Sequence, residues 1–348
     1  MSASRIVKIS LLVLLAVFII VAVKFLDLYK KAYSPNINNP SDKEFVLFIY
    51  SGWTYDSVIN AIELNHYVKN ISSFKWAAKK KNYANHVYPG RYVLEDRMSN
   101  NDIINKLRSG SQDVLNITFN NIRTLEELAE RISDQLEPSG NEFLETFNDS
   151  AVYTQYGFTY QTFPAMFIPN TYEFYWNTSA KRFVEKMYDE YERFWNKQRT
   201  FKAGKIGLTP VEVATLASIV EGETIKEDEK ADIAGVYINR LEKGMRLQAD
   251  PTVKFAINDF TIRRVLRKHY QTDSPYNTYK YAGLPPGPIC LPEISSIEAV
   301  LNYTDHNYMY FCAKSDFSGY HAFARTISEH NKNASAYQRE LNKRRIYK

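Results

Sequence analysis

An acidic residue that could take part in chemistry, Glu221, lies in the segment LASIVEGET, residues 216–224, two positions before a second glutamate, Glu223. A carboxyl group that is shielded from water favours its protonated form, which is what a general acid at neutral pH requires. The other use of such a group is a structural ion pair, and Arg240 and Arg246 are the candidate partners of Glu221. Spacing alone leaves both interpretations of Glu221 open.

The helix that carries Glu221 is predicted to run from residue 210 to about residue 224. Residues 209–212 read Thr-Pro-Val-Glu, which supplies an N-cap, a proline at the first helical position and the glutamate of a capping box. At about 100° per residue, Glu221 lies on a face of small residues, whereas Glu223 lies on the opposite side. We therefore expect a largely buried helix, with Glu223 as a solvated residue on its surface.

Other polar residues could share a cleft with this helix. Gln248 and Asp250 precede Pro251 at the end of an extended stretch, and a loop there would direct their side chains toward a cleft. Asp250 is either a second carboxylate of the site or the N-cap of a helix that begins at Pro251. His321, on the second strand of a hairpin predicted over 308–325, either reaches the site or makes a structural hydrogen bond.

A stiff loop follows these residues in the chain. The segment Tyr276-Asn277-Thr278-Tyr279 precedes GLPPGPI, residues 283–289, in which proline and glycine restrict the backbone enough to form the wall of a groove. The rings of Tyr276 and Tyr279 provide flat faces on which a sugar ring can stack.

The composition excludes several classes of protein. With 45% hydrophobic and 24% charged residues, the chain of 348 residues is typical of folded protein and has room for an anchor and two or three domains. The net charge of +5 favours anionic surroundings, but basic clusters such as Lys79–Lys81 have no base-reading motif beside them, so no nucleic-acid partner is expected. Cys290 and Cys312 should be two buried free thiols, and a single bridge between them is the alternative. The histidines lack ligand spacing, so neither a metal nor a cofactor is expected.

The N-terminus predicts attachment to a membrane. Residues 9–23 contain no charge, and the apolar stretch can extend to residue 26, so we predict a tail at 1–8, a transmembrane anchor at 9–26 and a linker at 27–42. A cleaved secretory signal is the alternative, but no small-x-small cleavage site follows before Lys30. Basic residues flank the stretch on both sides, so charge alone does not set the topology.

The rest of the chain is predicted to be α+β. Alternating strand and helix patterns over 43–112 indicate a small α+β module, and residues 113–200 read as a connecting α+β region that includes a strand at 114–119 and an amphipathic helix at 180–195. Residues 201–348 form a C-terminal mixed α+β domain that carries Glu221.

Several linked motifs resemble one protein family. They are LASIVEGET (216–224), YINRLEKGMRLQADPTV (237–253), YNTY (276–279), GLPPGPI (283–289), and GYHAF with EHN (319–331). In order and spacing these segments resemble the MltG (YceG-like) family of endolytic murein transglycosylases. The segment YPGRYVLEDRMSNNDIINKLRSG (88–110) is similar to the LysM-like module that precedes the catalytic domain in such proteins.

The resemblance implies a reaction in which a single carboxyl group suffices. The first glutamate of the family's VExET motif falls on Glu221, which would protonate the leaving oxygen of the β-1,4 bond between N-acetylmuramic acid and N-acetylglucosamine. The same group would then take the proton of the muramoyl C6 hydroxyl, which attacks its own anomeric carbon and leaves a 1,6-anhydro end. Hydrolases, in contrast, use two carboxyl groups.

The resemblance also implies a substrate, a location and partners. The substrate would be nascent peptidoglycan strands, cut outside the cytoplasmic (inner) membrane by a single-pass, periplasmic catalytic domain that terminates strand elongation beside peptidoglycan synthases. The residues expected to bind substrate are Gln248, Asp250, Tyr276, Asn277, Thr278, Tyr279 and His321.

Two loops depart from the family pattern. The usual Leu-Phe-Pro-Asp-Thr-Tyr is Phe-Ile-Pro-Asn-Thr-Tyr at 167–172, and the usual Asn-Pro-Gly after the proline-rich loop is Leu-Pro-Glu at 291–293. Substrate contacts at these loops could therefore differ. Two rivals remain open, a hydrolytic muramidase that admits water and a non-catalytic, membrane-anchored scaffold that binds peptidoglycan.

Overall fold

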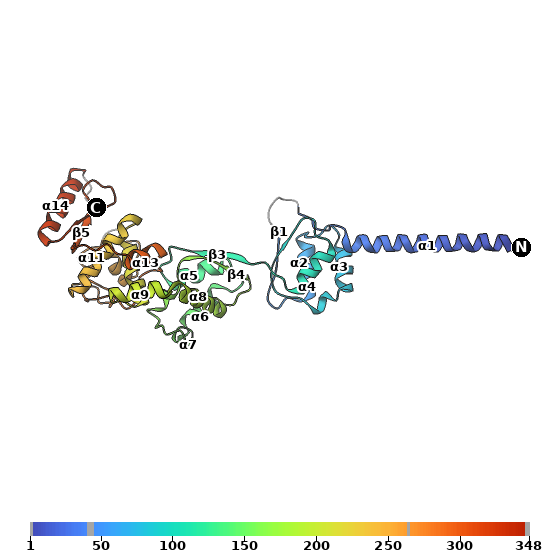
Figure 1. Cartoon of the computed structure of the whole chain (residues 1–348), viewed down its shortest axis with the longest axis horizontal. Helices are drawn as coiled ribbons and strands as arrows, with labels where there is room; N and C mark the ends of the chain where they lie inside the picture. Colours follow the sequence, from blue (N-terminus) through green and yellow to red (C-terminus); the bar gives the residue numbers. More distant parts are fainter. Residues whose placement is uncertain (1–2, 40–44, 263–264, 345–348) are drawn as a thin grey trace. The chain divides into compact units, whose positions relative to one another are not determined.

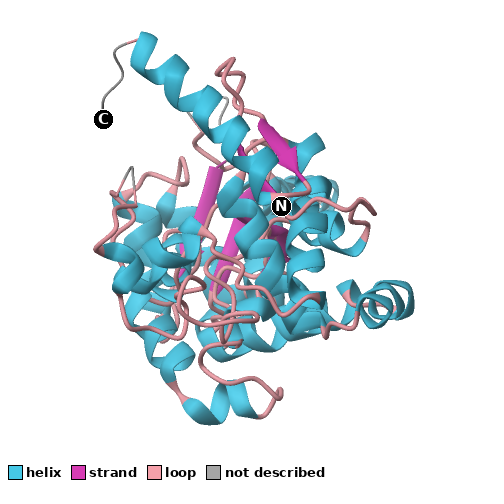
Figure 2. Ribbon diagram, turned by 90° about the vertical axis from the view of Figure 1, so that its left-hand side faces the viewer, coloured by secondary structure: helices cyan, strands magenta, loops and turns pink. Residues whose placement is uncertain are grey.

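The computed structural model describes residues 3–39, 45–262 and 265–344. It has the predicted mixed α+β character, with helices predominating and the strands of the described residues joined in two-stranded sheets (Figures 1 and 2). The chain divides into two compact units. Unit 1 comprises 1–116 with 173–178, and unit 2 comprises 117–172 with 179–348.

Unit 1 begins with a long apolar helix, α1 (Ala3–Tyr33), whose apolar side chains are exposed. The stretch from Arg5 to Tyr33 is long and apolar enough to cross a membrane. The helix does not end where the linker was predicted to begin, because residues 27–33 continue it and Asp27 pairs with Lys31 one turn later, at 2.8 Å. Residues 34–39 then contact the module that follows, and residues 40–42 of the predicted linker lie outside the described residues.

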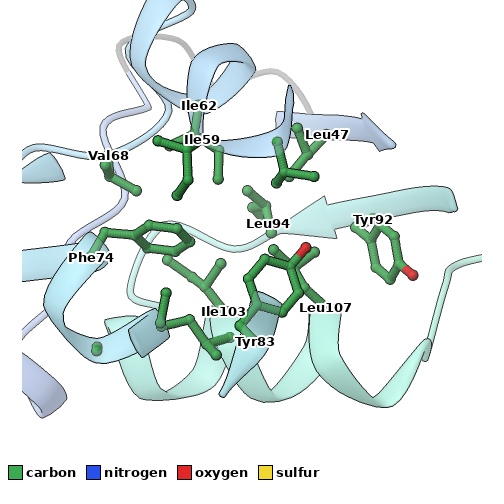
Figure 3. Packing of buried hydrophobic residues seen from close by; sticks show 14 of the residues in the cluster. Leu47, Ile59, Ile62, Val68, Phe74, Tyr83, Tyr92, Leu94, Ile103 and Leu107 are labelled. Atoms are coloured by element: carbon green, nitrogen blue, oxygen red, sulfur yellow. The ribbon is translucent and has the colours of Figure 1, made fainter. Parts of the chain in front are cut away.

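The module of unit 1 has an apolar core between an antiparallel strand pair and three helices. Its strands pair Phe45 with Leu94 and Ile49 with Gly90. Figure 3 shows side chains from the strands and helices meeting in this core, among them the buried Phe74. The elements are β1 (Phe45–Ile49), α2 (Tyr55–Leu64), α3 (Ile71–Lys80), a 3₁₀ turn η1 (Tyr83–Asn85), β2 (Gly90–Leu94) and α4 (Asn100–Ser109).

Unit 2 starts in strand β3 (Leu115–Phe119), which pairs with β4 (Asn170–Phe174). The helices between and after these strands bury a cluster of phenylalanine rings, for example Phe147 against Phe167 at 5.3 Å between ring centroids. These helices are α5 (Leu125–Ser133), α6 (Gly140–Asn148), α7 (Ser150–Thr154), η2 (Phe163–Met166), α8 (Ala180–Phe194) and α9 (Lys197–Ile206).

The C-terminal part of unit 2 is built around the predicted helix, which the structure confirms as α10 (Pro210–Glu223) with the Thr209 capping box in place. Side chains from 213 to 220 are buried, because α10 packs against α11, α12 and α13. The predicted hairpin is confirmed as β5 paired with β6. The remaining elements are η3 (Glu227–Glu229), α11 (Lys230–Glu242), α12 (Asp250–Ile257), η4 (His269–Gln271), α13 (Ile294–Leu301), β5 (Tyr310–Ala313), β6 (His321–Ala324) and α14 (Ile327–Lys343).

The predicted boundary near residue 200 does not separate compact units. Helix α9 packs against α13 and α10, and the backbone N–H of Leu291 donates to the carbonyl of Ile122 at 2.8 Å. Residues 117–172 and 179–200 therefore form one unit with the C-terminal domain. This joins the β3–β4 loops to the helix that carries Glu221.

Candidate active site

Unit 2 contains a cavity of about 940 Å³, and residues from the C-terminal part of α10 line it. Its volume lies in the upper part of the usual range for ligand sites. One wall comes from 118–123 and 169–171, and another from 289–295. The side chains that line it and could meet a ligand through polar atoms are Thr118, Asn120, Asn121, Arg123, Asn170, Thr171, Ser218, Glu221, Thr224, Glu227, Lys230, Lys254, Cys290, Glu293 and Ser295.

Glu221 lies in the last turn of α10, and its side chain is 21% exposed. Its Oε2 accepts hydrogen bonds from the hydroxyl of Ser296 and, at 3.2 Å, from the backbone N–H of Glu293. The ammonium group of Lys230 lies 3.8 Å from the same oxygen. All three described contacts thus involve Oε2, and none of the described contacts involves Oε1.

The cation beside Glu221 is a lysine and not an arginine. Arg240 is buried and donates to the carbonyls of Met309 and Leu247, both at 2.7 Å, so it holds the backbone together. Arg246 is exposed. The ion-pair alternative for Glu221 therefore holds with Lys230 and not with either arginine, and a cavity lies beside the pair.

Lys230 is a site residue that sequence reasoning missed. Its side chain is only 3% exposed, and its ammonium group donates to Glu227 at 2.7 Å and to Ser295 at 3.0 Å. A buried ammonium group requires such partners, and these hydrogen bonds hold the ammonium group of Lys230 close to Glu221. The only signal in the sequence was its position at the start of an amphipathic helix, which does not reveal what the side chain faces.

The segment 289–293, which belongs to one wall of the cavity, is hydrogen-bonded both to α10 and to the opposite wall. The N–H of Ile289 donates to the hydroxyl of Ser218 at 3.0 Å, and the carboxylate of Glu293 accepts from the N–H of Asn121 at 3.3 Å. Burial, assisted by the negative charge of Glu221, raises the pKa of Glu293. The two loops that depart from the family pattern both line this cavity.

Asp250 is not a second carboxylate of the cavity, nor is it an N-cap. Helix α12 begins at Asp250 itself, after Ala249. The Asp250 carboxylate accepts hydrogen bonds from the hydroxyls of Tyr279 at 2.7 Å and Tyr270 at 3.3 Å. Both hydroxyls donate to Oδ1, and Asp250 lies outside the described cavity lining.

The other residues expected to bind substrate also lie outside the described lining. The amide of Asn277 donates to two carbonyls of its own loop, and the hydroxyls of Thr278 and Thr252 lie 2.8 Å apart. Both Asn277 and Thr278 are buried, and their contacts hold the loop in its conformation. Tyr276 packs against Phe255, with 4.7 Å between ring centroids. Gln248 is exposed and adopts a positive φ of 51°.

His321 makes the structural hydrogen bond that was its alternative. Its Nδ1 lies 2.7 Å from Oε2 of Glu229, and its backbone N–H donates to Oε1 of the same residue at 2.7 Å. Glu229 is buried, so this pair joins β6 to η3. His321 is outside the cavity lining as described.

Glu223 is not the solvated residue that was expected. Its carboxyl group accepts a hydrogen bond from the hydroxyl of Tyr237 at 2.6 Å. Burial raises the pKa of Glu223 to about 7, and the negative charge of Asp250 adds to the effect. The helical period was correct, but α11 covers the side of α10 that was expected to face solvent.

Comparison with known proteins confirms the family that the sequence motifs resemble. The YceG-like family matches residues 47–336. The "Endolytic murein transglycosylase" of Bacillus subtilis is 30% identical over 330 residues, 89% of each chain, and that of Streptococcus pneumoniae D39 is 27% identical over 86% of this chain and 60% of that protein. A crystal structure of a YceG-like protein from Listeria monocytogenes aligns with a TM-score of 0.56 at 29% identity, covering 84% of this chain and 99% of that one. This chain therefore belongs to the YceG-like family.

Proposed function

We propose that this protein is an endolytic peptidoglycan lytic transglycosylase in which Glu221 is the catalytic acid and base. The observation that carries the proposal is that Glu221 lines a cavity of about 940 Å³ with one carboxyl oxygen held by three contacts and the other free of described ones. The names of the relatives from Bacillus subtilis and Streptococcus pneumoniae support it.

The proposed reaction moves one proton out and back. Glu221 donates a proton from Oε1 to the glycosidic oxygen, and the bond from this oxygen to the anomeric carbon of N-acetylmuramic acid breaks. The carboxylate then takes the proton of the C6 hydroxyl while O6 bonds to the anomeric carbon, which gives a 1,6-anhydro end. Ser296, Lys230 and the N–H of Glu293 keep the carboxyl group in one orientation through both steps.

The proposal extends to location and partners. Helix α1 supports a single-pass anchor in the cytoplasmic membrane, with the module of unit 1 and the whole of unit 2 on the outer, periplasmic side where peptidoglycan is made. There the enzyme would terminate the growth of nascent strands beside the synthases. The module of unit 1, which has its own core, would act as a LysM-like domain that holds glycan.

The test is cutting of purified glycan strands by the full-length chain in detergent, with mass spectrometry of the new ends. Glu221→Gln keeps the shape of the side chain but cannot donate the proton, so cutting should fall by at least about 100-fold. The matched control is Glu242→Gln, an exposed glutamate at the end of α11, which should cut like the wild type. Undiminished cutting by Glu221→Gln would refute the proposal.

The same digest separates the rival functions. A muramidase that admits water would leave reducing ends, each heavier by one water than an anhydro end. A non-catalytic scaffold would bind glycan without any cutting by the wild type. Asp250, the second carboxylate first considered for hydrolysis, is held by tyrosine hydroxyls, so it gives the hydrolytic rival no support.

A further inference from the structure

The hairpin of β5 and β6 packs against the short segment 224–230, which joins the helix that carries the catalytic carboxyl group to α11. The ammonium group of Lys226 lies 4.8 Å from the centroid of the Tyr320 ring. The hydroxyl of Tyr320 donates to Asp228 at 3.1 Å, although 92 positions separate the two residues in the chain. The hairpin therefore contacts this segment directly, and one further contact between them is buried.

That buried contact is made by Glu229, whose side chain is 4% exposed. Its Oε1 accepts from the backbone N–H of His321 at 2.7 Å. Its Oε2 accepts from Nδ1 of His321 at 2.7 Å and from the hydroxyl of Thr224 at 3.3 Å. Thr224 is the C-cap of α10, three residues after Glu221. Because carboxylate oxygens only accept, Nδ1 of His321 carries the hydrogen, and Glu229 joins β6 to the end of α10.

The segment 224–230 also supplies two charged groups to the cavity, and they stand on either side of Glu229 in the chain. Glu227 and Lys230 both line the cavity. They are joined by a hydrogen bond of 2.7 Å, and the ammonium group of Lys230 lies 3.8 Å from Oε2 of Glu221. Because Lys230 directly follows Glu229, a displacement of Glu229 moves the cation beside Glu221.

We propose that His321 is a positioning residue for the reaction, because its Nδ1–H fixes Glu229 in the segment 224–230. The fixed segment brings Lys230 to Glu221 and holds the last turn of α10. The inference rests on the proposed function, in which the orientation of Glu221 affects the rate. His321 lies outside the described cavity lining, so it acts without touching the substrate. A buried carboxylate that loses a donor keeps its desolvation cost, so the segment would shift until another donor or water reached it.

Three substitutions of His321 test whether a donor is needed at the place of Nδ1. His321→Asn carries an amide N–H about as far from the backbone as Nδ1, so it can still donate to Glu229. His321→Gln carries its amide one bond further out and cannot replace Nδ1 unless Glu229 moves. His321→Phe keeps a ring against Phe311, whose centroid lies 5.2 Å from that of His321, but donates nothing. The matched control is Tyr320→Phe, which removes the exposed hydrogen bond to Asp228 from the same hairpin and leaves Glu229 untouched.

The experiment measures kcat and KM of glycan cutting by the full-length chain in detergent, well below the melting temperature of every variant. His321→Phe and His321→Gln should lower kcat by roughly 10- to 100-fold and leave KM within about twofold, because the acid is misplaced while the groups that bind glycan stay in place. His321→Asn should recover most of the loss in kcat, and Tyr320→Phe should match the wild type. A purely structural role would lower melting temperatures and leave kcat of the folded variants unchanged.

The inference fails if folded His321→Phe cuts with the kcat of the wild type, or if Tyr320→Phe loses as much. It also fails if His321→Asn and His321→Gln have equal kcat, a comparison that holds even where phenylalanine prevents folding. A wild type that cuts no glycan, or undiminished cutting by Glu221→Gln, would instead refute the proposed function. Loss of cutting in Glu221→Gln with no difference among the His321 variants would refute this inference alone.

Discussion

Replacing Glu223 by glutamine should make the protein more stable at pH 8 and change its stability little at pH 5. In the folded protein the pKa of Glu223 is raised from 4.5 to about 7 by burial, while its carboxyl group accepts a hydrogen bond from Tyr237. The folded protein therefore favours the protonated form of Glu223. Above pH 7 the buried side chain carries a negative charge, and burial of that charge destabilises the folded protein.

The sign and size follow from proton linkage. Because the folded pKa exceeds the unfolded one, the stabilisation from the bound proton is fully present below pH 4.5 and is lost as the pH rises through about 7. The shift corresponds to at most about 3 kcal/mol, and less where water reaches the side chain. For a domain of the size of unit 2, this change in the free energy of unfolding corresponds to a shift of roughly 5–10 °C in melting temperature.

The assay is the melting temperature of wild type and Glu223→Gln from pH 5 to pH 8, with the exposed Glu242→Gln as control. Glutamine offers an amide oxygen to the Tyr237 hydroxyl, so the variant should melt with less dependence on pH. The difference between the two proteins should widen with pH around 7. A constant difference over this range would show that Glu223 does not titrate there, and the reasoning would be wrong.

Three further predictions address the cavity and the loop beside it. Ser296→Ala removes one of the donors to the Glu221 carboxylate, so it should lower glycan cutting by about tenfold and should also lower the melting temperature, because a hydrogen bond to a charged group contributes about 1.5–3 kcal/mol. Cutting equal to that of the wild type would contradict this. Tyr279→Phe should destabilise the protein by about 1.5–3 kcal/mol, because it removes the hydrogen bond to Asp250. It should change glycan binding little. Weaker glycan binding at unchanged stability would instead support a role for Tyr279 in substrate recognition. Gly287→Ala should lower the melting temperature clearly, because a Cβ there would lie 1.9 Å from the carbonyl oxygen of Gln161, and a normal melting temperature would show that the loop can move away.

Local features of the sequence were sufficient for several elements. Helix α10 begins where the Thr209 capping box predicts, the uncharged stretch near the N-terminus lies in α1, and the hairpin of β5 and β6 forms at the predicted place. Each of these depends on neighbours within a few residues, such as caps, hydropathy or a turn. The family motifs likewise indicated Glu221, which lines the cavity.

The groups around Glu221 were decided only by tertiary structure. The Ser296 hydroxyl and the Glu293 N–H come from residues more than 70 positions away, and Asn121 is 172 positions from the carboxylate it meets. Tertiary packing also moved Glu223 from solvent into contact with Tyr237. Periodicity determines which face of a helix a side chain occupies, but whether that face meets water, a hydroxyl or a charge depends on which distant segment packs against it.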